Sequence, residues 1–220
     1  MNLYTTLKQG ARPASEFEIK RSRFLGFAAR ASTEEQARRF LDDIRHAHRE
    51  ARHVCHAFVL GAARETQRSS DDGEPSGTAG APILKAITAR QIAHGRTDLS
   101  DVVVAVVRYF GGIKLGAGGL VQAYSDAAAA VLDAAAFVTR QRMRLITTAL
   151  PIAEAARVET RLRATGVLVH SVDYHADNVT LTIAVPDDRE RLNKTKANLA
   201  ALTAGEAEPT PGDQIWRDLD

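Results

Sequence analysis

Three carboxylates stand close together in a polar segment of the chain. Asp71, Asp72 and Glu74 fall within four positions, among glycine and hydroxyl residues. Clustered carboxylates can bind a hard cation or act as general acid and base, because neighbouring like charges move their pKa values apart. The spacing matches no EF-hand loop, and the same composition is typical of a surface turn. Two hypotheses therefore stay open for this acidic loop: a metal-dependent hydrolase or phosphotransferase site, and an acidic turn. The residues singled out are Ser70, Asp71, Asp72, Glu74 and Thr78.

A glycine-rich segment, residues 111–119, follows the apolar run over 102–107 and precedes a helical pattern. Backbone N–H groups at a helix start, together with the positive end of the helix dipole, can face an anion such as phosphate. Ala117 stands where a Walker A loop needs lysine, and Val121 stands at the third glycine of the dinucleotide fingerprint. The segment therefore predicts either a phosphate site or a tight turn in which glycine permits positive φ angles. The candidate phosphate- or RNA-binding residues are Arg108, Tyr109, Gly111, Gly112, Lys114, Gly116, Gly118 and Gly119.

A cluster of histidines around the single cysteine raises the question of zinc. On the predicted helix His46 and His48 point to different sides, and strand alternation points His56 away from His53 and Cys55. Ligands that point apart cannot surround one ion, so we favour packed or surface histidines over a metal site. A thiol inside a strand is usually buried and inert, and the sequence assigns no catalytic residue and no cofactor.

The elements that must position these loops follow from the hydrophobic pattern of the first 140 residues. The run over 102–107 is β-branched and small apolar throughout, which is typical of a central strand covered on both faces. Around it, the pattern predicts a strand pair over 16–30, a capped helix over 34–50, a strand near 53–60, a polar loop over 64–80, a helix from 82 to about 95, and a helix after 119.

The pattern changes near residues 139–144, where we place a domain boundary. Beyond it the sequence predicts a strand over 145–150, a helix over 152–164, strands over 167–174 and 179–185, a helix over 188–202 and a short last strand. That order is a split βαβ unit. We therefore expect an α+β protein with two domains, residues 1–140 and 141–220.

Composition excludes several classes of protein. The chain has 220 residues, 45% hydrophobic and 25% charged, which is typical of a soluble globule and not of a disordered or collagen-like chain. A net charge of +2 does not by itself indicate nucleic-acid binding, so any basic site must be local. With one cysteine and no apolar segment suited to a signal or a membrane span, we expect a cytoplasmic protein without membrane contact.

Three ordered blocks resemble the YigZ/IMPACT family. They are ARHVCHAF at 51–58, SDDGEPSGTAGAP at 70–82 and VRYFGGIKLGAGGL at 107–120. The resemblance covers residues 16 to 138, and the remainder is similar to the family's bacterial C-terminal domain, itself similar to the last domain of translation elongation factor G. It implies a first domain with the fold of the second domain of ribosomal protein S5 and a ferredoxin-like βαββαβ second domain. It also implies that the acidic loop and the glycine-rich segment line one surface.

The resemblance favours a translation-related role, because eukaryotic members of the family look like translational regulators. Our leading hypothesis is a non-enzymatic cytoplasmic factor that binds RNA or the ribosome, with the glycine-rich segment taking phosphate. The alternatives are an enzyme that uses Asp71, Asp72 or Glu74, and an adaptor that binds a protein of the translation apparatus.

Overall fold

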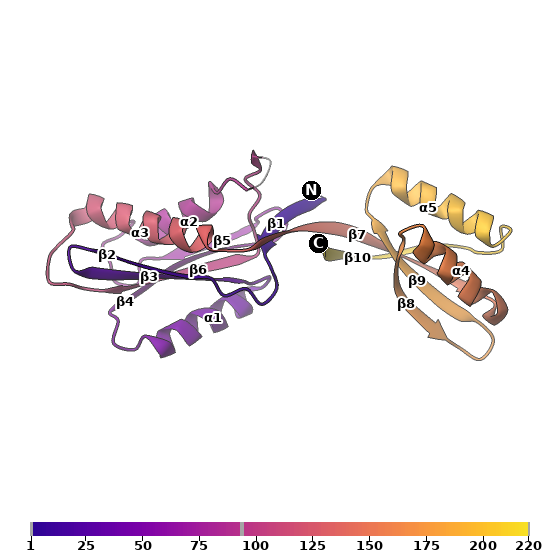
Figure 1. The fold of residues 1–220 in the computed structure, drawn as a ribbon, viewed down its shortest axis with the longest axis horizontal. Coiled ribbons are helices and arrows are strands. Elements are labelled where there is room, and N and C mark those ends of the chain that lie inside the picture. The colour runs from indigo at the N-terminus through magenta and orange to yellow at the C-terminus, as the bar shows by residue number, and fades with distance from the viewer. Residues whose placement is uncertain (1, 93–94, 220) are drawn as a thin grey trace. The chain divides into compact units, whose positions relative to one another are not determined.

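The computed structural model describes residues 2–92 and 95–219, which divide into two compact units of residues 3–139 and 140–219 (Figure 1). Both units combine helices with antiparallel sheets, so the expected α+β class is confirmed. None of the helices in the described chain has the length and apolar content needed to cross a membrane.

The first unit is built on one antiparallel sheet with strand order β2-β3-β6-β4-β5. Figure 1 shows α2 and α3 on one face of this sheet and α1 on the other. The elements in chain order are β1 (Leu3–Leu7), β2 (Ala14–Ile19), β3 (Ser22–Arg30), α1 (Glu34–Ala47), β4 (His53–Leu60), β5 (Thr66–Ser70), α2 (Gly80–Thr88), β6 (Val102–Tyr109) and α3 (Gly116–Asp133).

Strand β6 is the central strand that its apolar run predicts. Val104 and Val106 pack into the core under α2 and α3. Val107, the next residue, packs into the core under α1. Successive side chains of a strand point to opposite faces. The same alternation therefore carries Arg108 to the α2 and α3 face and Tyr109 to the α1 face.

Several boundaries in the first unit differ from the sequence prediction, and the first is that α1 ends at Ala47 and not at residue 50. The polar segment 64–80 is not all loop, because β5 pairs with β4 as an edge strand through backbone bonds that its polar side chains do not reveal. Helix α2 ends at Thr88, before the expected residue 95, because the Arg90 N–H donates to the Ile87 carbonyl in a tighter turn that does not continue the helix. Residues 93 and 94 of that expected helix lie outside the described residues.

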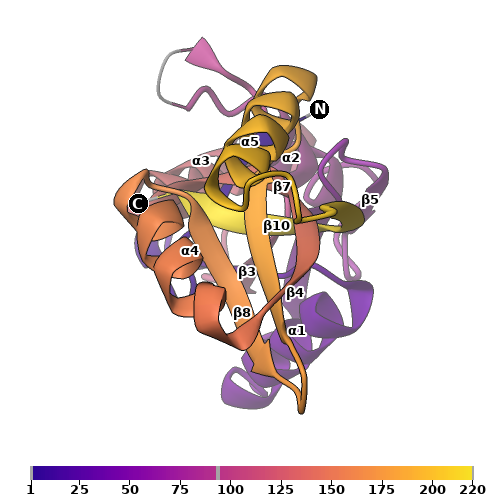
Figure 2. The same ribbon diagram turned by 90° about the vertical axis from the view of Figure 1, so that its right-hand side faces the viewer.

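The second unit has the expected order of strand, helix, two strands, helix and strand, and Figure 2 looks onto it. Its sheet has the order β7-β9-β8, with β10 also paired to β7. Buried Val179, Leu181 and Ile183 alternate with half-buried threonines on β9, as the pattern predicts. The elements are β7 (Phe137–Leu150), α4 (Ile152–Ala164), β8 (Leu168–Tyr174), β9 (Val179–Pro186), α5 (Arg189–Leu202) and β10 (Thr210–Leu219).

Two strands of this unit are longer than predicted. Strand β7 starts at Phe137 and not at residue 145, so the pattern change near 139–144 falls inside a continuous strand. The arginines there are tolerated because carboxylates partner them, Asp218 with Arg140 and Asp187 with Arg144. The last strand, β10, is ten residues long and not short.

The core under α2 should dominate the stability of the first unit. Ile83 is fully buried there, and Ile83→Ala is expected to lower the free energy of unfolding by roughly 2–5 kcal/mol, because it removes apolar contacts and leaves a cavity. Ile113, 45% exposed, is the matched control, and Ile113→Ala should change stability by less than about 0.5 kcal/mol. Urea unfolding measures both. Equal losses in the two variants would contradict this core.

Candidate functional site

Asp71 organises the acidic loop and the start of α2. One carboxylate oxygen accepts the N–H groups of Ala79 and Gly80 at 2.9 and 2.8 Å, and the other accepts the N–H of Gly77 at 2.8 Å. Desolvation disfavours the ionised form, but the three backbone donors together outweigh it and lower the pKa of Asp71. Asp71 therefore caps a helix that has no side-chain cap at Ala79.

Asp72 ties the acidic loop to β4 and α1. Its carboxylate accepts the N–H of Val54 at 2.7 Å and lies 3.4 Å from the guanidinium of Arg45. Its carbonyl oxygen lies 2.8 Å from Nδ1 of His53. Asp72 adopts a φ of +43°, in the left-handed region that asparagine and aspartate tolerate better than most residues. The carboxylate oxygens of both aspartates thus contact N–H groups and a guanidinium of the chain itself.

Glu74 is buried and faces the end of β6. Its Oε1 accepts hydrogen bonds from Arg108 at 2.6 Å and from the Tyr124 hydroxyl at 2.8 Å. The side chains of Arg108 and Glu74 are only 7% and 4% exposed. The guanidinium also lies over two aromatic rings, with its Cζ 5.6 Å from the Phe24 centroid and 5.4 Å from that of Phe110. The pair therefore compensates two charges that would be costly if buried alone.

Cys55 belongs to the same buried network. Its Sγ donates to the Asp71 carbonyl at 2.9 Å and lies 3.3 Å from the Tyr124 hydroxyl. Burial raises the pKa of the Cys55 thiol to about 12 and, with the neighbouring thiol and Glu74 carboxylate, also raises the pKa of Tyr124. Neither group is ionised at neutral pH, so this thiol is a poor nucleophile.

Ser70 and Thr78 complete the acidic loop. The Ser70 hydroxyl accepts the N–H of Asp72 at 3.2 Å, and the Thr78 hydroxyl donates to the carbonyl of Pro75 at 2.6 Å. Gly80 is required by space, because a Cβ there would lie 2.8 Å from backbone atoms of Ser70. The loop is thus a set of closed turns and not an open cradle of ligands.

The glycine-rich segment forms a turn that presents its side chains outward. Phe110 is 50% exposed, and Lys114 is exposed and makes no ion pair or hydrogen bond in the part of the chain that the structure describes. Helix α3 begins at Gly116, so Gly116, Gly118 and Gly119 form its first turn instead of preceding it. Leu115 at the N-cap offers no side-chain acceptor, and the first N–H groups of α3 have no side-chain partner there.

The turn is anchored to the tip of the β2–β3 hairpin. The Gly111 N–H donates to the Ser22 hydroxyl at 3.2 Å, and a Cβ at Gly111 would lie 2.0 Å from the carbonyl carbon of Arg21. Lys20 and Arg21 at that tip are exposed, so they add two cations beside the turn. Sequence reasoning missed them, because nothing in the local pattern of residues 16–30 indicates which distant turn the hairpin meets.

We call the exposed part of this region the turn surface: Lys20, Arg21, Phe110, Ile113 and Lys114.

Two predicted phosphate-binding residues lie elsewhere. Arg108 is buried against Glu74 and is not a surface ligand. Tyr109 lies on the opposite face of the sheet, where its hydroxyl is 2.9 Å from Nδ1 of His48. Both follow from strand alternation at the end of β6, which separates neighbouring residues by the thickness of the sheet. Of the three acids in the loop, Glu74 is the one that pairs with Arg108.

The histidines near Cys55 are distributed over different surroundings. His48 packs at 5.2 Å from the Phe27 ring, and burial lowers the pKa of His56. In residues 2–92 and 95–219 no group of three or more His, Cys, Asp or Glu side chains is arranged to hold a metal ion.

Comparison with known proteins places the chain in a family. Residues 20–132 match the family model described as the Impact N-terminal domain. A Bacillus subtilis protein, IMPACT family member YvyE, is 34% identical over 216 residues, covering 98% of this chain and 94% of the relative. The chain belongs to the IMPACT family. Escherichia coli YigZ, another member, is 46% identical over 109 residues, covering 49% of this chain and 50% of the relative.

A solved structure has a similar fold over nearly the whole of this IMPACT-family chain. A crystal structure described as that of a hypothetical protein is 30% identical, has a TM-score of 0.67 and covers 97% of this chain and 98% of its own. A yeast relative, Protein IMPACT homolog of Saccharomyces cerevisiae, is 36% identical over 118 residues, covering 51% of this chain and 42% of the relative.

Replacement of Asp71 should destabilise the IMPACT-family fold in a pH-dependent way. A carboxyl whose pKa is lowered by folding stabilises the protein above the unfolded pKa of about 3.9, and the contribution is lost as the pH falls through the folded pKa. Asp71→Asn should therefore cost roughly 1–3 kcal/mol at pH 7 and less at pH 3. Urea unfolding at both pH values tests this, with Asp42→Asn, 76% exposed, as control. A cost independent of pH would contradict the capping role.

The buried ion pair predicts a non-additive double variant. Arg108→Met should cost about 3–5 kcal/mol, because it leaves the Glu74 carboxylate buried without its cation. Adding Glu74→Gln removes that charge and keeps an acceptor for Tyr124, so the double variant should be more stable than Arg108→Met alone. Equilibrium unfolding compares the three proteins. A double variant less stable than the single one would show that the pair does not control this region.

Proposed function

We propose that this protein is a non-enzymatic, cytoplasmic, translation-associated factor that binds RNA or the ribosome through the turn surface. The observation that carries the proposal is the composition of that surface. An exposed aromatic ring, three cations and an uncapped helix start lie within one anchored turn and its neighbouring hairpin tip.

Each part of the turn surface suits a part of a nucleic-acid strand. Exposed Phe110 offers a face on which an unpaired base can stack, and the cations Lys20, Arg21 and Lys114 suit phosphate. The free N–H groups of the first turn of α3 are donors for a further phosphate oxygen. The Arg108 guanidinium beneath Phe110 and the Gly111 anchor hold the turn in place, which lowers the entropy lost on binding.

The acidic loop supports a structural role better than an enzymatic one. Asp71 and Asp72 accept backbone N–H groups, and Glu74 is buried against Arg108. A general base or a metal ligand needs an oxygen that reaches substrate or ion, whereas each of these carboxylates already accepts donors of the protein itself.

A protein-binding adaptor is the second candidate, and one observation favours it. Ile113 and Val121 are 45% and 40% exposed in the same segment as Phe110, and exposed apolar residues in one region are typical of protein interfaces. A ribosomal protein or a factor of the translation apparatus would be the partner. Salt dependence separates the two candidates, because phosphate contacts release counterions and apolar contacts do not.

Sedimentation with ribosomes tests the proposal. The wild-type protein should co-sediment at low salt and be released as salt rises. Lys114→Ala should lower the slope of log affinity against log salt by about one, and Phe110→Ala should weaken binding about tenfold through lost stacking. Lys85→Ala removes an exposed lysine from α2 in the same unit and is the matched control.

The two variants distinguish RNA binding from protein binding at the turn surface. Salt-resistant binding that is lost in Phe110→Ala but not in Lys114→Ala would favour the adaptor. Binding unchanged in both variants would exclude the turn surface as the interface.

A further inference from the structure

The second unit contains a groove in which positive charge is concentrated. It lies between β7, the first turns of α5 and β10, has a volume of about 600 Å³ and is separate from the acidic loop and the turn surface. Four basic side chains line it against one carboxylate, that of Asp187, so three positive charges are in excess. We call it the basic groove: Arg142, Arg144, Arg189 and Lys196, with the amides of Asn193 and Gln214.

Asp187 orients the two arginines of β7 instead of cancelling the charge of the groove. Its side chain is 7% exposed, and its oxygens lie 2.9 Å from Nε of Arg142 and 3.2 Å from Nε of Arg144. Gln214 donates to the same carboxylate at 2.8 Å, and Arg144 also donates to the Gly212 carbonyl at 3.0 Å. Both arginines are held in position by these contacts while remaining 28% exposed.

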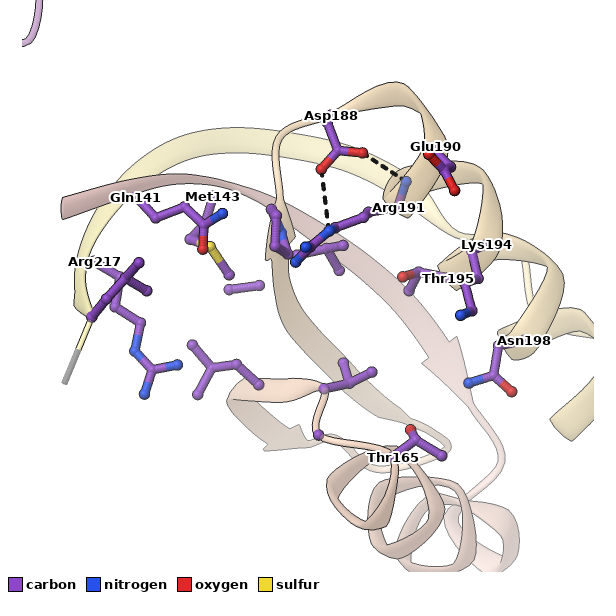
Figure 3. A pocket seen from close by; sticks show the side chains of 17 residues that line it. Gln141, Met143, Thr165, Asp188, Glu190, Arg191, Lys194, Thr195, Asn198 and Arg217 are labelled. Carbon is purple, nitrogen blue, oxygen red and sulfur yellow. Dashed lines mark hydrogen bonds and ion pairs between the residues drawn. The ribbon is translucent and has the colours of Figure 1, made fainter. Parts of the chain in front are cut away.

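A larger pocket on the other side of α5 provides a contrast. Figure 3 shows the side chains that line it. The pocket has a volume of about 980 Å³, and its lining includes the cations Arg191, Lys194 and Arg217 and the acids Asp188 and Glu190. Asp188 lies 3.5 Å from Arg191 and accepts its backbone N–H, as the dashed lines mark. The charges there are nearly balanced, so this pocket lacks the excess that would select an anion.

The basic groove fits a phosphate-bearing strand better than a single small anion. Its cations come from two elements and are partly exposed along an open surface, whereas a lone anion is usually held by convergent buried donors. Leu192 and Pro211 provide apolar area, and the amide of Asn193 can bond sugar or base edges. These are the groups that contact a nucleic-acid backbone and its neighbouring sugars.

We propose that the basic groove is a second RNA-binding site, which takes phosphates of the RNA backbone. The assignment of RNA rests on the proposed function, whereas the phosphate chemistry follows from the groove itself. Arg189 and Lys196 contact the phosphates from α5, and the arginines oriented by Asp187 contact them from β7.

Binding of a labelled single-stranded RNA to the full chain, followed by fluorescence anisotropy over a salt series, tests this site. Arg189→Ala and Lys196→Ala are chosen because neither forms an ion pair with Asp187. Each should weaken binding by roughly three- to tenfold and lower the salt slope by about one. Lys194→Ala, on α5 but facing the balanced pocket, should leave both quantities unchanged. Circular dichroism checks that each variant is folded.

A competition arm identifies the source of the phosphate. Inorganic pyrophosphate should displace RNA only at concentrations far above the RNA Kd. Tight pyrophosphate binding that Arg189→Ala abolishes, with RNA binding unchanged, would overturn the RNA assignment in favour of a small free polyphosphate. Unchanged RNA affinity and salt slope in the Arg189→Ala/Lys196→Ala double variant would overturn the groove itself.

The same assay with Lys114→Ala separates this inference from the proposed function. Loss of RNA affinity in the groove variants but not in Lys114→Ala would support the groove and reject the turn surface. The reverse result would reject the groove alone. No measurable RNA binding by the wild-type chain would overturn both RNA assignments, leaving ribosome sedimentation to test a protein contact.

Discussion

The ion pair between Glu74 and Arg108 is buried at the point where the acidic loop, the end of β6 and helix α3 meet. Removing either charge from water without its partner would cost several kcal/mol, so the loop must fold over the strand end for both to be tolerated. Tyr124 donates a second hydrogen bond to the same carboxylate oxygen and joins α3 to this contact. The positions of Cys55 and Asp71 follow, since both lie in the network that surrounds this pair.

This constraint separates the acids from the surface chemistry of the first unit. Three carboxylates that could have formed a catalytic cluster instead cap α2, bind β4 and neutralise a buried arginine. The groups that can reach a ligand from solvent lie instead on the turn surface, where cations and an aromatic ring are exposed. Phe110 connects the two regions, because its ring covers the guanidinium of Arg108 and is still half exposed.

In the second unit, an ion-paired aspartate leaves its arginines partly exposed to solvent. Asp187 is as buried as the partners of the first unit's ion pair, but it serves two arginines at once and both stay 28% exposed. One carboxylate shared by two cations leaves positive charge facing water, whereas one carboxylate for one buried cation leaves none. The ratio of acids to bases and the depth of burial therefore decide whether an ion pair stabilises the core or prepares a surface for an anion.

The sequence by itself determined the α+β class, the central position of β6, the bounds of the helices in the second unit and the order of that unit, because hydrophobic periodicity reports directly on burial. The composition of the acidic loop and of the glycine-rich segment also identified both as candidate functional segments. The sequence could not show β5, whose polar residues pair through the backbone, nor the roles of Lys20 and Arg21. Only the tertiary structure decided that Arg108 is buried and Tyr109 lies on the opposite face. Strand alternation separates the two side chains, but their partners, Glu74 and His48, lie 34 and 61 positions away, and such distant contacts leave no local pattern.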